Sequence, residues 1–361
     1  MLRPNELGDD ALIIAEVGQN HQGDFDMARE YIRTFAGAGA DVVKFQTRDN
    51  RYLFAEEAYA KSYNSENAFA PTYGKHRESL ELDADKLHVL REDCAQNEVL
   101  FMSTPFDEPS LERLVELGVA LLKIASFDLG NLPLIDKIGR TGLPVVLSVG
   151  GGNAEQIKAS VETLRAHHDD IAVLHCVSEY PCPVERLGLD NIDALRAAFP
   201  DLSVGLSDHF NGILSGPVAY LKGARVFEKH VTLNRSLKGT DHSFSLEPGG
   251  FRRFVRDIRR VPQMMTPKPA EDLGTEAVFQ KLGKSLVAAR PLAAGAVLTL
   301  DDLSGRIFNE QIIPVRRSVE VIGRRLKVDL EKGAALRFEM LELPDSAVGD
   351  RSAAGEREEH A

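Results

Sequence analysis

Charged and polar side chains recur at the ends of short apolar runs that have the composition of β-strands. Lys44 and Lys123 lie within two such runs, and together they could hold a phosphate and a carboxylate. An unpaired lysine is costly to bury in an apolar strand, so each needs either an acidic side chain, a route to solvent or an anionic ligand. The same residue type in two equivalent places favours a site for an anion.

His209 and His230 follow two neighbouring runs of the same kind. Two imidazoles can share one divalent ion and leave coordination positions open for water and a substrate oxygen, an arrangement suited to Lewis-acid chemistry. A single histidine at a strand end is more often a hydrogen-bonded structural residue. The residues by themselves therefore leave both readings open.

Other polar groups accompany these four at the strand ends. Side-chain alternation places Lys44 with Gln46 on one face of its strand, and Glu228 with His230 on one face of another. The remaining strand-end groups are Glu16, Ser103, Thr104, Ser126, Asp128, Ser178, Tyr180 and Ser207.

Eight apolar runs separated by amphipathic stretches must position these groups. The predicted strands are 12–17, 41–45, 99–102, 120–124, 144–149, 171–175, 203–206 and 225–231, and helical spacing covers 26–38, 154–166 and 187–199, for example. Eight such units predict an α/β fold with a (β/α)8 TIM barrel, whose active sites lie at the C-terminal ends of the strands. A doubly wound sheet is the alternative, but the glycine-rich fingerprint that often follows its first strand is absent.

The pattern changes beyond the barrel and predicts four segments. Residues 1–261 form the barrel domain, with a long insertion at 48–83 after the second strand. The proline-containing stretch 262–283 reads as a linker, and 284–343 as a small β-rich domain. The polar residues 344–361 are predicted to be a disordered tail.

The composition of the chain limits the classes of partner that we expect. A net charge of −12 argues against nucleic acid, although a few lysines in one pocket can still bind a small anion. No apolar run reaches the length of a membrane-spanning helix, and the N-terminus lacks the features of a secretory signal. Three scattered cysteines do not form a disulfide framework. A cytoplasmic enzyme with small-molecule substrates is the expectation.

The residues at the strand ends lie in motifs that resemble the sialic acid (N-acetylneuraminate) synthase family along almost the whole chain. These motifs are IIAEVGQNHQGDFDMAREYI, GADVVKFQT, FMSTPFD, LLKIASFD, LHCVSEYPCP, VGLSDH, FEKHVTL and KGTDHSFSLEP, in the family's order and spacing. The C-terminal domain resembles the antifreeze-like (SAF) module that ends these synthases, most clearly at 321–323 and 337–341.

The resemblance implies a transferase that condenses phosphoenolpyruvate with an N-acetylmannosamine-like aldose. The products would be a nine-carbon 2-keto-3-deoxy (nonulosonic) acid and phosphate, released by C–O cleavage. It implies a divalent ion, Mn²⁺ or Mg²⁺, on His209 and His230, and a domain-swapped homodimer. The implied phosphoenolpyruvate-binding residues are Lys44, Thr104, Lys123, Ser126, Ser178 and Ser207.

The resemblance also implies sugar-binding and catalytic positions. The implied sugar-binding residues are Glu16, Asn67, Asp128, Tyr180, Asp241 and Arg306, and the implied catalytic residues are Glu16, Gln46, Asp128, Glu228 and Asp241. Asp128 stands where many bacterial members have Glu, and Ser178 where some have Asn. The family's usual sugar-contacting arginine stretch reads SGRIFNEQIIPVRRS here, so Arg306, Arg316 and Arg317 are all candidates.

The acceptor sugar therefore stays open between N-acetylmannosamine, its 6-phosphate and the modified sugars of legionaminic or pseudaminic acid synthesis. One alternative is another phosphoenolpyruvate condensation that makes a seven- or eight-carbon sugar acid. A more distant alternative is a non-catalytic carbohydrate-binding or ice-binding protein, for which paired lysines and histidines at strand ends have no use.

Overall fold

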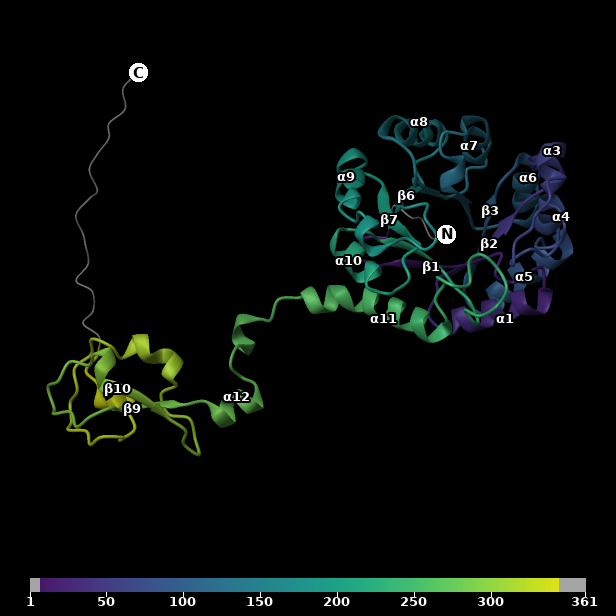
Figure 1. The fold of residues 1–361 in the computed structure, drawn as a ribbon. Coiled ribbons are helices and arrows are strands. Elements are labelled where there is room, and N and C mark those ends of the chain that lie inside the picture. Colours follow the sequence, from purple (N-terminus) through teal and green to yellow (C-terminus); the bar gives the residue numbers. More distant parts are fainter. Residues whose placement is uncertain (1–6, 344–361) are drawn as a thin grey trace, which may run out of the picture. The chain divides into compact units, whose positions relative to one another are not determined.

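A computed structural model describes residues 7–343 and divides into two compact units, which meet in sequence between Thr266 and Pro267. The first unit is a closed barrel of eight parallel strands in chain order, wrapped by helices (Figure 1). Its strands are β1 (Leu12–Gly18), β2 (Val42–Thr47), β3 (Leu100–Pro105), β4 (Leu121–Ile124), β5 (Val145–Ser148), β6 (Ile171–Cys176), β7 (Ser203–Asp208) and β8 (Val226–His230). The predicted (β/α)8 barrel is confirmed, and each strand overlaps its predicted range.

The alternation of side chains along each strand divides the barrel into two apolar layers. Outward residues such as Ile13 and Val43 join the large core under the helices, while inward residues such as Leu12, Ile14 and Val42 form a smaller core inside the barrel. The inward row of β1 then continues to Glu16 at the C-terminal end. The barrel interior is therefore apolar at its floor and charged at its mouth, as the strand sequences require.

The helices of the barrel domain include three that lie in the predicted insertion at 48–83. They are α1 (Phe25–Ala36), α2 (Asn50–Leu53), α3 (Glu56–Tyr59), α4 (Tyr73–Glu78), α5 (Ala84–Gln96), α6 (Glu108–Leu117), α7 (Leu132–Gly139), α8 (Ala154–Arg165), α9 (Asn191–Ala198), α10 (Ser215–Leu221) and α11 (Pro248–Met265). The prediction of a helix from residue 187 was wrong at its start, because a 3-10 turn (Val184–Arg186) and Gly188, with φ of +55°, precede α9.

The insertion is a packed lid and not an irregular loop. Its buried centre is His76, whose ring lies 4.6 Å from that of Tyr63 and 5.9 Å from that of Phe69. Asn67 ties this lid to the loop after β8, because its Oδ1 accepts a hydrogen bond of 3.0 Å from the backbone N–H of Gly239. The lid is therefore held beside the barrel mouth.

The second unit contains α12 (Ala277–Leu282) and a two-stranded antiparallel sheet of β9 (Ser285–Ala288) and β10 (Leu303–Arg306). Ten buried apolar residues, among them Leu286, Val321 and Leu341, form its own core. The small β-rich domain expected from the sequence is thus present. The boundaries of the predicted linker stay a prediction: α11 runs through Pro262 to Met265, and α12 lies within 262–283. The predicted tail, 344–361, lies outside the described residues.

No helix within residues 7–343 combines the length and the apolar character needed to cross a bilayer.

Candidate active site

A cavity of about 530 Å³ opens at the C-terminal mouth of the barrel. It is lined by twelve of the residues that the sequence singled out: Glu16, Lys44, Gln46, Thr104, Lys123, Ser126, Tyr180, Ser207, His209, Glu228, His230 and Asp241. Six of the eight strands contribute residues, namely β1 to β4, β7 and β8, and the others lie in the loops after β4, β6, β7 and β8. The parallel order brings these strand ends together, although they lie far apart in the sequence.

Two lysines and two carboxylates form the buried centre of this cavity. Lys44 Nζ lies 2.7 Å from Glu16 Oε2 and 3.6 Å from Glu228 Oε2, and Lys123 Nζ lies 3.9 Å from Glu228 Oε1. All four side chains are nearly inaccessible to solvent, with exposed fractions of 2–6%. The sheet register sets Glu16 beside Lys44, since these two residues are direct partners between β1 and β2.

Hydroxyl groups complete the environment of the lysines. Lys44 Nζ donates to Thr104 Oγ1 at 3.2 Å, and Lys123 Nζ donates to Ser148 Oγ at 2.6 Å. Ser207 Oγ donates to Glu228 Oε1 at 3.1 Å. Because these contacts are short and buried, the ammonium groups are held in place before any ligand arrives.

Burial and pairing move the pKa values of the two carboxylates in opposite directions. Burial raises the pKa of Glu16 to about 7, although Lys44 acts against this. Burial also penalises the charge of Glu228, but Lys123 and Lys44 outweigh it and lower the pKa of Glu228. Near neutral pH one carboxylate is fully ionised and the other titrates, which suits Glu16 to proton transfer.

The lysines respond to the same surroundings. Lys44 is buried, yet its two carboxylate neighbours raise its pKa and keep it charged. Burial lowers the pKa of Lys123, and the nearby Glu228 carboxylate offsets this effect only in part. An incoming anion would stabilise the charged form of Lys123. The anion site at the two lysines stays a prediction, and these surroundings are compatible with it.

The two histidines lie together at one side of the cavity. Their ring centroids are 5.3 Å apart, and the ring of Tyr180 lies 4.0 Å from that of His209. His209 Nδ1 is 2.7 Å from the carbonyl oxygen of Val177, which can only accept, so Nδ1 carries the proton and Nε2 keeps its lone pair.

His230 is available in a similar way. Its Nδ1 is buried without a hydrogen-bond partner in the described part of the chain and lies 3.8 Å from Asp241 Oδ2. Within residues 7–343 no set of three histidine, cysteine or acidic side chains converges as metal ligands. The two imidazoles would leave the other positions of a divalent ion to water or substrate, so they fit the ion that the family resemblance implies, and that ion stays a prediction.

Four predicted site residues do not line this cavity. Asp128 lies in a 3-10 turn (Ser126–Asp128) just behind it, where burial raises the pKa of its carboxyl and Asn131 donates to it at 3.0 Å. Asn67 is the lid residue that accepts from Gly239. Arg306 is the last residue of β10 in the second unit.

Ser178 is exposed, but it lies beside Ser126. A Cβ atom added to Gly150 would come within 2.6 Å of Ser178 Oγ and 2.9 Å of Ser126 Oγ. The backbone N–H of Gly150 donates to Ser126 Oγ at 2.9 Å. The Ser126 and Ser178 hydroxyls and Gly150 thus form a small polar cradle from the segments after β4, β5 and β6.

Arg48 and Arg77 also line the cavity and were missed from the sequence. The Arg48 guanidinium is buried over the Phe106 ring at 3.8 Å and donates to Gln46 Oε1 at 2.6 Å, and burial lowers its pKa to about 10. Arg77, on α4, donates to Gln19 Oε1 at 2.5 Å, while its buried Nε has no hydrogen-bond partner among the described residues. The i, i+2 series Lys44, Gln46, Arg48 could have revealed Arg48, but nothing in the sequence indicates Arg77.

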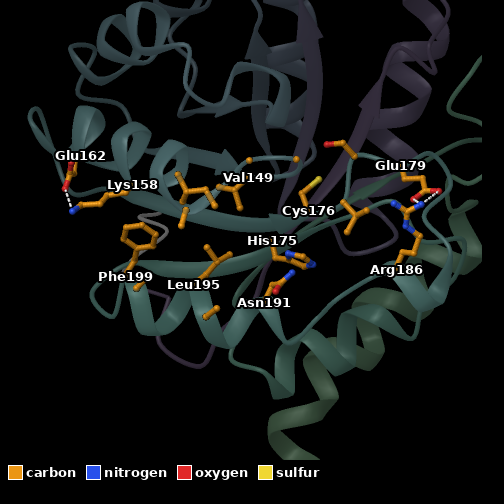
Figure 2. Close-up of a pocket in the computed structure, with 18 of the residues that line it drawn as sticks. Val149, Lys158, Glu162, His175, Cys176, Glu179, Arg186, Asn191, Leu195 and Phe199 are labelled. Carbon is orange, nitrogen blue, oxygen red and sulfur yellow. Dashed lines mark hydrogen bonds and ion pairs between the residues drawn. The ribbon is translucent and has the colours of Figure 1, made fainter.

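A larger hollow of about 960 Å³ lies on the flank of the barrel between α8 and α9 (Figure 2). Apolar side chains such as Val149, Leu195 and Phe199 line it, and its charged groups are paired, as in Lys158–Glu162 and Arg186–Glu179. It includes only Ser178 of the predicted site residues. Among the described residues, buried polar atoms without a hydrogen-bond partner are nevertheless more numerous at the barrel mouth, on Glu16, Gln19, Arg77, Glu228 and His230, than in this hollow, on Arg165 and Glu179.

Removing Lys44 should destabilise the fold in a pH-dependent way. Lys44→Met leaves Glu16 and Glu228 buried without their shared cation, which we expect to cost about 3 kcal/mol of unfolding free energy at pH 8. A carboxyl whose folded pKa is raised binds its proton more tightly in the folded state, so the loss should shrink as the pH falls to 5. Urea unfolding at the two pH values measures this.

The double variant Lys44→Met, Glu16→Gln should recover part of the loss at pH 8, because it removes one unpaired charge. Lys222→Met, which breaks an exposed pair with Asp190 and Asp193, is the matched control and should change little. Equal stability of Lys44→Met and the parent protein at pH 8 would contradict this account of the cluster.

Comparison with known proteins finds likeness over both units. The NeuB family model matches residues 31–269, and the SAF domain model matches residues 283–342. N-acetylneuraminate-9-phosphate synthase of Mus musculus is 35% identical over 331 residues, which cover 91% of this chain and 92% of the relative. N,N'-diacetyllegionaminic acid synthase of Legionella pneumophila is 32% identical over 348 residues, or 94% and 97% of the two chains.

Solved structures agree with this likeness. The N-acetylneuraminic acid (sialic acid) synthetase of Leptospira borgpetersenii, solved in complex with citrate, superposes with a TM-score of 0.65. It is 31% identical and covers 73% of this chain and 89% of its own. A truncated 3-deoxy-D-arabino-heptulosonate 7-phosphate synthase of Thermotoga maritima, with a TM-score of 0.53 and 16% identity, shares the fold.

Proposed function

Because the chain belongs to the NeuB family, we propose that it condenses phosphoenolpyruvate with an N-acetylmannosamine-like aldose. The products are a nine-carbon 2-keto-3-deoxy acid and inorganic phosphate. The observation that carries this proposal is the buried cluster of Lys44, Lys123, Glu16 and Glu228 next to two imidazoles in one cavity. The relatives named as synthases of sialic and legionaminic acids support the same reaction class.

Phosphoenolpyruvate binds at the lysines. Lys44 and Lys123 neutralise its carboxylate and phosphate, and Thr104 and Ser207, which already hydrogen-bond within the cluster, orient it. The hydroxyls of Ser126 and Ser178, with Gly150 between them, offer further donors for phosphate oxygens. Binding of the anion therefore compensates for the desolvation of Lys123, which Glu228 offsets only in part.

The reaction needs one proton delivered and one removed. C3 of phosphoenolpyruvate bonds to the aldehyde carbon of the open-chain aldose, whose oxygen takes a proton, and water adds at C2 before the C–O bond to phosphate breaks. Glu16, with a pKa of about 7, is suited to move the proton at the sugar. Glu228 stays ionised and, with Gln46, faces the attacking water. Asp241 and Tyr180 of the cavity hold the sugar, and Asp128 and Asn67, which do not line the cavity, are further predicted sugar contacts.

His209 and His230 would hold the divalent ion, Mn²⁺ or Mg²⁺, which supplies Lewis-acid polarisation of the aldehyde when bound. Their lone pairs are available because His209 uses Nδ1 for Val177 and His230 has a buried nitrogen without a partner within residues 7–343.

Phosphate release should depend on both an acceptor and a metal. Purified protein with phosphoenolpyruvate and Mn²⁺ is expected to release phosphate only when an N-acetylmannosamine-type aldose is present, and EDTA should abolish the release. Lys123→Met should raise the KM for phosphoenolpyruvate at least ten-fold, because it removes one of two buried cations. Exposed Lys158→Met is the control and should behave as the parent protein. Release with erythrose or arabinose phosphates alone would favour the shorter sugar acid instead.

The arginines Arg48 and Arg77 favour an acceptor with an anionic substituent, such as the 6-phosphate. Both line the cavity beside Gln46 and Gln19, and they repel each other enough that Arg77 contributes to the lowered pKa of Arg48. The carboxylate near them, Glu81, does not line the cavity. An anion on the acceptor would relieve this repulsion.

Arg77→Leu should therefore separate the possible acceptors. We expect the KM for N-acetylmannosamine 6-phosphate to rise at least ten-fold, while kcat/KM for N-acetylmannosamine and for diacetamido sugars changes less than about three-fold. Arg51→Leu, an exposed arginine of the same lid, is the control. Equal losses with neutral and phosphorylated acceptors would remove the argument for an anionic substituent.

A homodimer and a cytoplasmic location complete the proposal. Large apolar side chains are exposed along 264–282, at Met264, Met265, Leu273, Val278, Phe279 and Leu282, and a second copy of the chain would cover them. The functional domain boundaries are proposed as 1–261 and 284–343, and the sugar-contacting arginine stays open between Arg306, Arg316 and Arg317.

Sedimentation equilibrium tests the dimer. At micromolar concentration we expect twice the mass of the 39.7 kDa chain, and the double variant Phe279→Ser, Leu282→Ser should shift the equilibrium toward the single chain. Val319→Ser, which changes another exposed apolar residue of the second unit, should leave the mass unchanged. A parent protein with the mass of one chain would exclude the dimer.

A further inference from the structure

Lys229 stands between the site residues Glu228 and His230 but faces the opposite side of the barrel wall. Alternation along β8 sends Glu228 and His230 into the cavity, and Lys229 outward beneath the helices. Its side chain is only 1% exposed, and its Nζ lies about 6 Å from the rings of Phe210 and Phe254. A charge in this apolar layer needs a partner.

That partner is Asp208, which directly precedes His209. Asp208 and Lys229 are register partners between β7 and β8, and Lys229 Nζ lies 2.7 Å from Asp208 Oδ2. The carboxylate also accepts from Ser215 Oγ at 2.5 Å and from the backbone N–H of Phe210 at 2.9 Å. Every oxygen of this buried carboxylate is therefore engaged.

Lys229 holds the turn that carries His209 from both sides. Besides Asp208, its ammonium donates to the backbone carbonyl of Phe210, so the residues before and after His209 both bind it. On the cavity side, the carbonyl of His209 accepts from the backbone N–H of Cys182 at 3.0 Å. One lysine thus connects the turn bearing His209 to the strand bearing His230.

We propose that the Lys229–Asp208 pair is the positioning element that sets the separation of the His209 and His230 imidazoles, and through it the affinity for a divalent ion. This inference rests on the proposed function, because it assumes that the two imidazoles bind the ion. Neither Lys229 nor Asp208 touches the cavity. Each acts through the histidine next to it in the chain.

A role in stability alone does not account for this pair. Outward positions such as Ile13 on β1, Val43 on β2 and Phe227 on β8 are apolar, and they fill that layer without desolvating a charge. Replacing a buried ion pair by uncharged residues of similar volume is often neutral for folding. What apolar side chains cannot do is bind a carboxylate and a carbonyl on either side of one residue, because they offer no directed hydrogen bonds.

The double variant Lys229→Met, Asp208→Asn tests the inference. It removes both charges, and the asparagine keeps its Oδ1 as the acceptor for the Phe210 N–H while its amide can donate to Ser215 Oγ. We expect the Kd for Mn²⁺, measured by calorimetric titration in the absence of substrates, to rise about ten-fold or more. The melting temperature of the metal-free protein should change by less than about 5 °C. A wild-type Kd with an intact fold would overturn the inference.

The control variant removes a part-buried ion pair between two helices outside the barrel. Arg29 and Asp93 join α1 to α5 at 2.6 Å, and Arg29→Met, Asp93→Asn should leave the Kd for Mn²⁺ unchanged. An equal loss of affinity in this control would mean that any lost ion pair weakens the site, which also overturns the inference.

Asp208→Asn alone keeps the test available if the double variant does not fold. It preserves the side-chain shape and the contact of Lys229 with Phe210, and we expect a Kd raised at least three-fold, whereas an unchanged Kd counts against the inference. A parent protein that binds no Mn²⁺ would contradict the proposed function itself. A parent that binds Mn²⁺ together with a double variant that binds equally well would contradict only the positioning role.

Discussion

The Glu16–Lys44–Glu228–Lys123 cluster is the interaction on which the site depends. Charges inside a protein persist only where opposite charges and hydrogen bonds compensate for lost water. Here the compensation comes from strand register, since Glu16 is the partner of Lys44 between β1 and β2, and β8 delivers Glu228 beside both lysines. The closed barrel thus compensates for the desolvation of these four charges in the protein without a ligand.

The alternation of side chains along the strands separates the polar residues at the barrel mouth from the residues that support them. Inward residues change from Leu12 and Ile14 to Glu16 along β1, so the apolar floor of the barrel supports the charged mouth. On β8 the alternation sends Glu228 and His230 inward and Lys229 outward, where it pairs with Asp208. At β7 and β8 one face of the barrel wall therefore carries predicted site residues, and the other face carries the ion pair that is proposed to position them.

The lid adds the contacts that the barrel strands cannot reach. Arg48 donates to Gln46, which donates to Glu16 at 2.7 Å, so a chain of hydrogen bonds runs from the base of the lid to the titrating carboxyl. Two residues of the inserted segment make further hydrogen bonds. Asn67 accepts from the backbone of the loop after β8, and Arg77 donates to Gln19. This region borders the part of the cavity that is proposed to hold the sugar.

The sequence by itself determined the eight strands, their chain order and the face on which each strand-end residue lies. Periodicity is a local property, so Lys44 with Gln46 and Glu228 with His230 could be assigned to common faces without coordinates. The tertiary structure decided which faces meet. It paired Lys229 with Asp208, brought Arg77 of the lid to the cavity, and left Ser178 exposed beside Ser126. Those outcomes depend on register between strands and on the path of long loops, which join residues distant in the chain and leave no periodic trace in it.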